Sequence, residues 1–425
     1  MNWVSAIFFG ICVGVILTVF KRGADPLSPA RVFGFTWSLA IGLAELKLSG
    51  FQEEWSAESW ILLLAGVGSV LVGLFIAYTL NMRRTLIPVA TMRSLVKKEQ
   101  VNESRLFWLI CLSAAVYCLS YLAHYLIRGW LPVFVVGSKL SRVDFNVYGL
   151  TLLLFSAAFI VFFTVVYSLF VKGRKGRKAI LIASTVVVVG SYFLLLQRFQ
   201  IIMAAVMCFT LLYYATWHVR PRLIAPFFLA IGGFFYWISS LRFTTVAATF
   251  LYTTSKMKFS RDLAILTEPY MYVVMNLENF ARAVKQLDFH TYGYFTFDFI
   301  AAITGLKYWL VDYLNLDRTP YLISAYNTYS AFWWFYFDFG VFGVTLIPLI
   351  LGVAAGLLYY RMRSTPTIRN VTAYGVTLFV LLISFFVFPV MYLWFVYNLL
   401  ALYLILRWTV RLPKNITQVS PEALA

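Results

Sequence analysis

The chain has 425 residues, of which 62% are hydrophobic and only 12% are charged. Soluble globular domains carry about a quarter charged residues, so this composition excludes a soluble fold and makes lipid the main solvent of the chain. The formal net charge of +18 is not gathered in a water-facing basic domain, which excludes a nucleic-acid-binding protein.

Long apolar runs recur along the chain, and a helix needs about 20 such residues to cross a bilayer. The first run is followed, not preceded, by the basic pair Lys21-Arg22, so we expect a retained span and not a secretory signal. We predict an all-α fold, a polytopic transmembrane helical bundle of about eleven spans that forms one membrane domain over residues 1–425. The predicted spans are 3–20, 32–46, 60–80, 106–127, 150–171, 179–196, 201–217, 223–241, 339–360, 371–388 and 391–406.

Basic residues are unevenly distributed between the two sides of this arrangement. Most of the 35 lysines and arginines fall in short loops on one side, and the densest run extends from Lys172 to Lys178. The positive-inside rule therefore predicts that this side is cytoplasmic, with the amino terminus outside and the carboxyl terminus in the cytoplasm. We interpret the run as a topology determinant, and binding to anionic lipid headgroups is the alternative.

The longest predicted loop covers residues 242–327, outside the membrane, between the eighth and ninth spans. Apolar residues from Leu263 to Leu287 recur at helical spacing in this loop, and Glu278 and Arg282 lie one turn apart. This spacing predicts an amphipathic helix.

Two further apolar segments flank the end of this loop. Residues 299–316 contain isolated charges, which favours an interfacial or re-entrant segment over a span. The aromatic run at residues 332–337 predicts an interfacial belt that leads into the ninth span, and stacking of sugars on these rings is the alternative.

Cofactor motifs are missing from the sequence. The four cysteines lie in apolar runs without a CxxC spacing, which indicates neither a disulfide nor a metal site. There is no glycine-rich lysine loop, no DxD pair and no His/Glu cluster. We therefore expect no metal, no nucleotide and no other cofactor.

Several arginines on the predicted outer side are not explained by topology. Arg198 lies between two apolar runs with hardly a loop, which predicts a position at the membrane edge or in a polar cavity. A snorkelling cap of a tight hairpin is the alternative. Arg242 ends the eighth span, where an interface anchor is equally expected, and Arg142 and Arg318 lie in loops. Arginine binds phosphate bidentately, so this set favours an anionic substrate from the outer leaflet.

The same side offers candidates for a general base, which are Asp144, Glu268, His290, Asp298, Asp317 and Asp338. His290 shortly precedes Tyr292-Gly293, and a plain surface histidine is the alternative. Asp338 lies among glycines that allow close helix packing, and a structural pairing with an arginine is its alternative.

Short motifs along most of the chain are similar to those of one family. They are Asp25-Pro-Leu-Ser-Pro29, Gly129 to Phe134 followed by Arg142, the Arg198 hairpin, Tyr292-Gly293, and Asn327-Thr328 through Asp338-Phe339-Gly340 to Gly343. In this order they resemble the O-antigen polymerase (Wzy-like) family, the oligosaccharide repeat unit polymerases. Gln197 departs from the small residue usual before the hairpin arginine.

This resemblance implies a membrane glycosyltransferase that polymerises repeat units linked to polyprenyl (undecaprenyl) pyrophosphate, for O-antigen of lipopolysaccharide or a related surface polysaccharide. The reaction would occur on the outer face of a bacterial inner membrane. Four arginines would bind the pyrophosphate or an acidic sugar, namely Arg142, Arg198, Arg242 and Arg318. Glu268 or His290 would take the proton of the acceptor hydroxyl. The implied partners are the lipid-linked glycans, membrane lipids, a chain-length regulator and a flippase.

Two other functions remain open on the sequence. An O-antigen ligase would need similar arginines and a similar outer loop. A flippase or transporter typically has internal repeats, which are not found here, and has less need of a long external loop.

Overall fold

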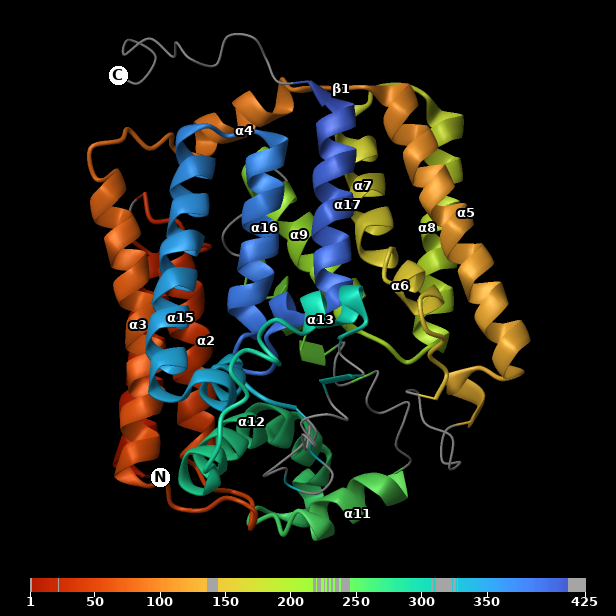
Figure 1. The fold of residues 1–425 in the computed structure, drawn as a ribbon. Coiled ribbons are helices and arrows are strands. Elements are labelled where there is room, and N and C mark those ends of the chain that lie inside the picture. The colour runs from red at the N-terminus through yellow and green to blue at the C-terminus, as the bar shows by residue number, and fades with distance from the viewer. Residues whose placement is uncertain are drawn as a thin grey trace. The chain divides into compact units, whose positions relative to one another are not determined.

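The computed structural model describes residues 2–21, 23–135, 144–216, 245–306 and 328–411, with scattered positions between 216 and 245 and between 306 and 328. The described residues are mainly helical, as predicted for an all-α protein (Figure 1). Contacts group the chain into two compact units, and each unit is assembled from three separate stretches. Unit 1 comprises Met1–Arg83, Leu229–Tyr360 and Thr377–Val396, and unit 2 comprises Arg84–Phe228, Arg361–Val376 and Tyr397–Ala425. The single membrane domain over residues 1–425 stays a prediction.

Unit 1 contains α1 (Trp3–Val19), α2 (Pro29–Ala44), α3 (Ala57–Asn81), α11 (Thr245–Thr254), η3 (Arg261–Leu266), α12 (Thr267–Gln286), α13 (Asp298–Thr304), most of α15 (Ala331–Ser364) and η4 (Pro389–Met391). It also contains the end of α16 (Ile368–Ile383) and the beginning of α17 (Leu393–Thr409). Helices α1 and α2 pack antiparallel: Ser5 Oγ donates to Gly42 O at 2.8 Å near one end, and Arg31 Nε donates to Thr18 Oγ1 at 2.9 Å near the other.

Glycines bring α3 and α15 into backbone contact. A Cβ added to Gly73 would lie 2.2 Å from Leu349 O, and one added to Gly352 would lie 2.3 Å from Val70 O. Real Cβ atoms do not approach a carbonyl oxygen so closely, so both positions require glycine. This is the small-residue packing by which membrane helices associate without a hydrophobic driving force.

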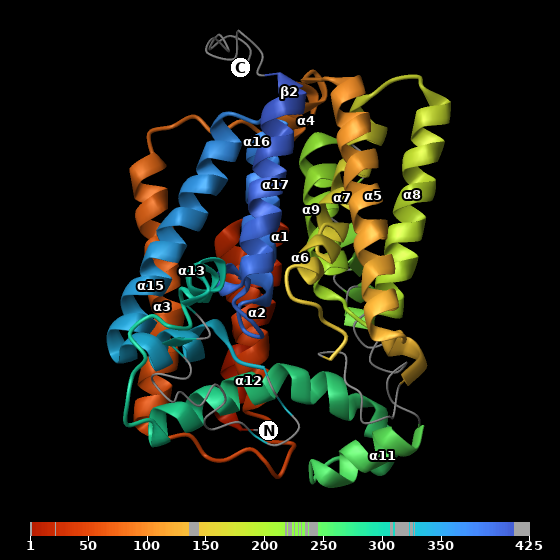
Figure 2. The same ribbon diagram turned by 45° about the vertical axis from the view of Figure 1, so that its right-hand side comes forward.

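The predicted amphipathic helix is confirmed as α12, which lies crosswise to α2 and α3 and packs against both (Figure 2). Its Glu278 is 1% exposed and accepts hydrogen bonds from Trp55 Nε1 at 2.9 Å and from the Glu53 amide at 3.0 Å. Lys47 Nζ lies 3.9 Å from this carboxylate, and Arg282 Nε lies 3.8 Å from it, one helical turn away as predicted. Burial raises the pKa of Glu278, although these donors and cations oppose the shift.

The aromatic run at the start of α15 is part of the core of unit 1, so the prediction of an interfacial belt is wrong. Trp333 and Phe337 are fully buried, and Phe332 stacks on Trp37 of α2 at a centroid distance of 4.4 Å. Tyr336 packs edge-on against Phe280 of α12 at 6.1 Å. Six consecutive helical residues point to all sides, and here the neighbouring elements cover every side.

Unit 2 contains α4 (Val89–Lys97), β1 (Gln100–Val101), α5 (Glu103–Arg128), η1 (Pro132–Val135), α6 (Leu150–Leu154), α7 (Ala157–Phe170), α8 (Lys175–Leu194), α9 (Phe199–Ala215) and β2 (Val410–Arg411). Helix α7 packs against α5, α8 and α9 (Figure 2). Strands β1 and β2 pair antiparallel and so connect the start of α5 to the end of α17.

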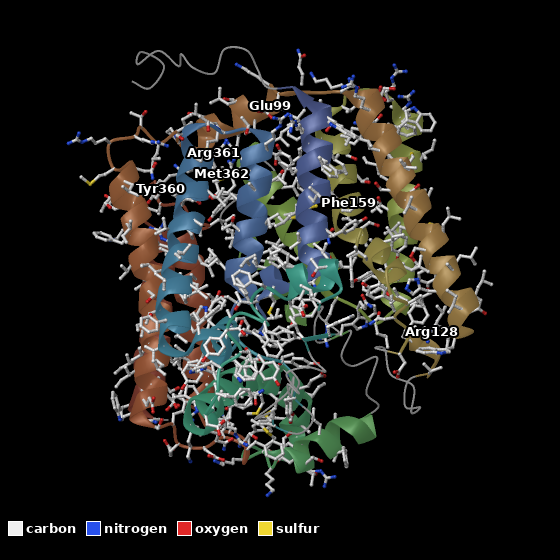
Figure 3. All side chains as sticks on the ribbon, viewed as in Figure 1. Glu99, Arg128, Phe159, Tyr360, Arg361 and Met362 are labelled. Carbon is white, nitrogen blue, oxygen red and sulfur yellow. The ribbon has the colours of Figure 1, made fainter. Side chains whose placement is uncertain are left out.

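Basic side chains gather at one end of unit 2, which we call the basic end. Arg177 Nη1 lies 2.6 Å from Glu103 Oε1, so the starts of α5 and α8 meet there. Arg105 donates to Trp408 O at 3.4 Å, and Arg369 donates to Val410 O at 2.6 Å, which places the end of α17 beside them. Glu99 lies at this end, and Arg128 lies at the opposite end of the same unit (Figure 3).

Among the residues that the structure describes, five helical segments are long and apolar enough to cross a membrane, namely Ala57–Asn81, Glu103–Val135, Leu150–Phe170, Lys175–Leu194 and Ala331–Ser364. Shorter apolar helices cover Trp3–Val19, Phe199–Ala215, Ile368–Ile383 and Leu393–Thr409. Helices occupy ten of the eleven predicted spans, and the remaining span, 223–241, is described only at scattered positions. These properties are those of an all-α membrane protein, and the number of crossings stays a prediction. Most of the interfacial segment predicted at 299–316 also lies outside the described residues.

Candidate functional site

Arg198 is a buried cation at the start of α9. Helix α8 ends at Leu194, Leu196 adopts a left-handed φ of 54°, and Arg198 directly precedes α9. The arginine is 5% exposed. A snorkelling side chain would keep its guanidinium in water, so this burial disfavours the snorkelling hairpin cap, and the polar cavity stays a prediction.

Two amide side chains lie in the same region of unit 2. Gln200 is 1% exposed and Asn398 is fully buried, and Asn398 Nδ2 donates to Gln200 Oε1 at 3.3 Å. We call Arg198, Gln200 and Asn398 the arginine–amide cluster. Asn398 was not predicted as a site residue, although a polar residue within an apolar run was the available signal.

The arginine–amide cluster and the basic end lie at opposite ends of α9. This helix has 17 residues, so its ends are roughly 25 Å apart. At the end of α9 that is far from Arg198, Arg93 Nε donates to Tyr213 O at 3.0 Å and Arg93 Nη2 donates to Val219 O at 3.2 Å. Arg198 is therefore far from the basic end, where the positive-inside rule alone accounts for the basic residues.

His290 lies in unit 1, beyond the end of α12. Its side chain is exposed, and its ring packs edge-on against Tyr336 at a centroid distance of 5.8 Å. A Cβ added to Gly340 would lie 2.9 Å from His290 Nε2. Gly340 has φ 58° and ψ −138°, which interrupts α15. The glycine therefore provides both the break in the helix and the space for the imidazole.

Asp338 fixes the segment that follows His290. The carboxylate is fully buried and accepts hydrogen bonds from the Thr291 hydroxyl and from the amides of Phe295 and Thr296. The Tyr292 amide donates to Asp338 O at 2.9 Å. These bonds give Asp338 a structural role, which was the alternative to a role as general base. The donors that the structure describes are a hydroxyl and two amides, not the expected arginine. Two motif segments far apart in the sequence are neighbours in the fold.

Glu268 lies in the first turn of α12 and is 9% exposed. Nearby Tyr326 shares a hydrogen bond of 3.0 Å with Ser255 Oγ, and burial, with a smaller contribution from Glu268, raises the tyrosine pKa to about 12. Helix α12 has 20 residues and is therefore roughly 30 Å long. Since His290 follows its far end, the structure does not bring Glu268 and His290 to one reacting atom.

The other predicted arginines, Arg142, Arg242 and Arg318, lie outside the described residues, as does Asp317. Arg198 belongs to unit 2, whereas Glu268 and His290 belong to unit 1. Within the described residues, no group of three or more histidine, cysteine, aspartate or glutamate side chains could hold a metal ion.

A second histidine, His124, has a structural role. It is fully buried, its Nδ1 lies 2.7 Å from Ser120 O, and its Nε2 lies 3.0 Å from Thr151 Oγ1. The bond to Thr151 connects α5 to α6, whereas the bond to Ser120 lies within α5, and the ring stacks on Phe145 at 5.4 Å.

Comparison of the chain with protein-family models, with curated proteins and with solved structures finds no match. The resemblance to the O-antigen polymerases therefore rests on the short motifs alone. Two of these motifs, around Tyr292-Gly293 and Asp338-Phe339-Gly340, lie in contact within unit 1.

Proposed function

We propose that the chain is a membrane glycosyltransferase that polymerises oligosaccharide repeat units carried on polyprenyl pyrophosphate. The observation that carries the proposal is the burial of Arg198 in a unit of apolar helices, two residues before the buried Gln200, which accepts a hydrogen bond from Asn398. An ionisable group is costly in such surroundings, and where it persists it typically serves a substrate or ion. The planar guanidinium fork matches phosphate groups bidentately, as the binding of a pyrophosphate requires.

In this reaction the acceptor hydroxyl attacks the anomeric carbon of the donor glycan. The bond between that carbon and the pyrophosphate oxygen breaks, and the lipid pyrophosphate leaves with the bonding electrons. Arg198 would stabilise the charge that develops on the leaving group, because a buried cation is less screened by water. Arg142, Arg242 and Arg318 remain further candidates for phosphates or an acidic sugar. The pyrophosphate linkage already activates the sugar, so the reaction consumes no nucleotide.

The acceptor hydroxyl must lose a proton, and His290 is the better of the two proposed bases. Its imidazole is exposed, whereas Glu268 is 9% exposed at the opposite end of α12. A general base must come within hydrogen-bonding distance of the substrate hydroxyl, which an exposed side chain can do without rearrangement. Asp338 acts as a positioning residue because it holds the segment that carries His290.

We place the reaction on the outer face of a bacterial inner membrane. The basic end of unit 2 would face the cytoplasm by the positive-inside rule, and the arginine–amide cluster lies at the other end of α9. The amino terminus would then be outside and the carboxyl terminus cytoplasmic. A flippase would deliver the lipid-linked units, and a chain-length regulator would act on the product.

The test is the surface glycan of a strain that lacks this gene, resolved by repeat number on a gel. A single repeat on the final acceptor supports the polymerase. Lipid-linked polymer that accumulates without transfer identifies a ligase, and single units that remain on the cytoplasmic side identify a flippase. Either of these two results overturns the proposal.

Complementation with point variants then tests the role of Arg198. We expect Arg198→Ala to abolish the ladder and Arg198→Lys to restore it only in part, because lysine keeps the charge but loses the bidentate geometry. Arg84→Ala is the control, since Arg84 is an exposed arginine in unit 2. A full ladder from well-inserted Arg198→Ala protein would remove this arginine from the site.

A further inference from the structure

A shallow groove of about 520 Å³ opens between α5 and α17 at the basic end of unit 2. It is lined by Ser104, Arg105, Trp108, Leu109, Leu112 and Trp408. Its volume lies within the range of roughly 300–1,000 Å³ that is usual for small-molecule sites. The groove is distinct from the arginine–amide cluster, which lies at the other end of α9.

The walls of the groove are apolar and exposed. Trp108 is 64% exposed, Leu112 is 61% exposed and Trp408 is 59% exposed. Both α5 and α17 are apolar helices, so lipid surrounds this surface in a membrane. Tryptophan side chains at the ends of membrane helices mark the level of the headgroups. The groove therefore extends from the headgroup level into the acyl region.

The mouth of the groove is positively charged. Arg105 is exposed and forms no ion pair within the part of the chain that the structure describes, and its described hydrogen bond is to the Trp408 carbonyl. The nearby carboxylate of Glu103 is already paired with Arg177 at 2.6 Å. Arg407, in the last turn of α17, is also exposed. An anion at the mouth would meet the charge of Arg105, which no described carboxylate cancels.

We propose that this groove is a binding site for an anionic phospholipid. One acyl chain lies along Leu109 and Leu112 between the two tryptophans, and the headgroup phosphate pairs with Arg105. The charge selects an anionic lipid over a zwitterionic one, and the apolar walls select a lipid over free phosphate. The inference does not depend on the proposed glycosyltransferase activity.

The test is native mass spectrometry of the delipidated full chain, titrated with phosphatidylglycerol or with phosphatidylcholine of the same acyl chains. We expect Arg105→Gln to weaken phosphatidylglycerol binding about fivefold, the factor that corresponds to about 1 kcal/mol for one basic residue near the membrane surface. Phosphatidylcholine binding should be unchanged. Leu112→Trp, which fills the groove without changing the charge, should weaken the binding of both lipids.

Arg84→Gln is the matched control, because it removes an exposed arginine of unit 2 that does not line the groove. Equal losses in Arg105→Gln and Arg84→Gln would show attraction to net charge alone and would overturn the proposal. Equal binding of the two lipids by the wild type would also overturn it. Displacement of phosphatidylglycerol by millimolar inorganic phosphate would identify a free-phosphate site instead. Since Arg105 is exposed, the charge variant should fold even if Leu112→Trp does not.

Discussion

Glu99 should make the stability of the protein fall as the pH rises through neutrality. Its carboxyl lies between α4 and β1, is 6% exposed, and accepts a hydrogen bond from the Ile368 amide at 2.8 Å. Burial, only partly offset by that bond and by Arg369, raises its pKa from 4.5 to about 7. At 1.36 kcal/mol for each pKa unit, this difference corresponds to roughly 3 kcal/mol.

The raised pKa means that the folded state binds the proton more tightly than the unfolded state does. The stabilisation is therefore complete below pH 4.5 and is lost as the pH rises through about 7. Glutamine cannot ionise, but its carbonyl can still accept the Ile368 hydrogen bond. We therefore expect Glu99→Gln to exceed the wild type by less than about 1 kcal/mol near pH 5 and by roughly 3 kcal/mol at pH 8.

The assay is the fraction of detergent-solubilised protein that stays monodisperse after heating, measured from pH 5 to pH 8. A difference of roughly 3 kcal/mol corresponds to several degrees in Tm for a chain of this size. Glu54→Gln is the control, because Glu54 is exposed, and it should keep the wild-type dependence on pH. Parallel curves for Glu99→Gln and the wild type would refute the reasoning.

Three further substitutions test the packing and the proposed site. Gly352→Val should lower stability by about 1–3 kcal/mol because its Cβ meets a backbone carbonyl of α3, whereas Gly68→Val, with open space around it, should not. Glu278→Ala should cost about 3–5 kcal/mol in the same heating assay, because it leaves buried donors and cations without their carboxylate, and Glu278→Gln should cost less. Asp338→Ala should shorten the glycan ladder and increase proteolysis near His290, because the segment loses three hydrogen bonds.

Distinct outcomes would contradict these three predictions. Equal stability of the two glycine variants would mean that α3 and α15 can separate at no cost. A wild-type melting curve for Glu278→Ala would mean that water replaces the carboxylate. Loss of the ladder in Asp338→Ala without any change in proteolysis would mean that Asp338 acts in the reaction itself and does not merely position His290.

The helices could be predicted from the sequence because the thickness of a bilayer sets their length and composition. Their ends were harder to predict. Helix α2 begins at Pro29, directly after Ser28, and not at the predicted residue 32. Proline fits the first turn of a helix, where no amide donor is needed, so this start had a recognisable signal.

The aromatic run before Asp338 shows where composition is ambiguous. Tryptophan, tyrosine and phenylalanine suit both a membrane interface and a protein core. Which environment they occupy depends on α2 and α12, which come from distant parts of the sequence. Local sequence holds no information about that contact.

The candidate site was predictable in part. An arginine in a very short connection between apolar runs pointed to Arg198, and its burial disfavours the alternative of a snorkelling cap. Its neighbourhood was not predictable, since Asn398 contacts Gln200 across 198 sequence positions. The hydrogen bond between Thr291 and Asp338 likewise joins residues that are 47 positions apart in the sequence. Side-chain pairs at such separations are set by tertiary packing.

The interleaving of the two units along the chain has a consequence for biogenesis. Helices α2 and α3 of unit 1 leave the ribosome long before α12, against which they pack, because residues 84–228 of unit 2 are made in between. At about 5–20 residues per second, this gap lasts on the order of ten seconds or more. During that time the buried faces of Phe33 and Trp37 lack their final neighbours. A membrane chaperone or the insertion machinery would have its clearest opportunity to bind the nascent chain in this interval.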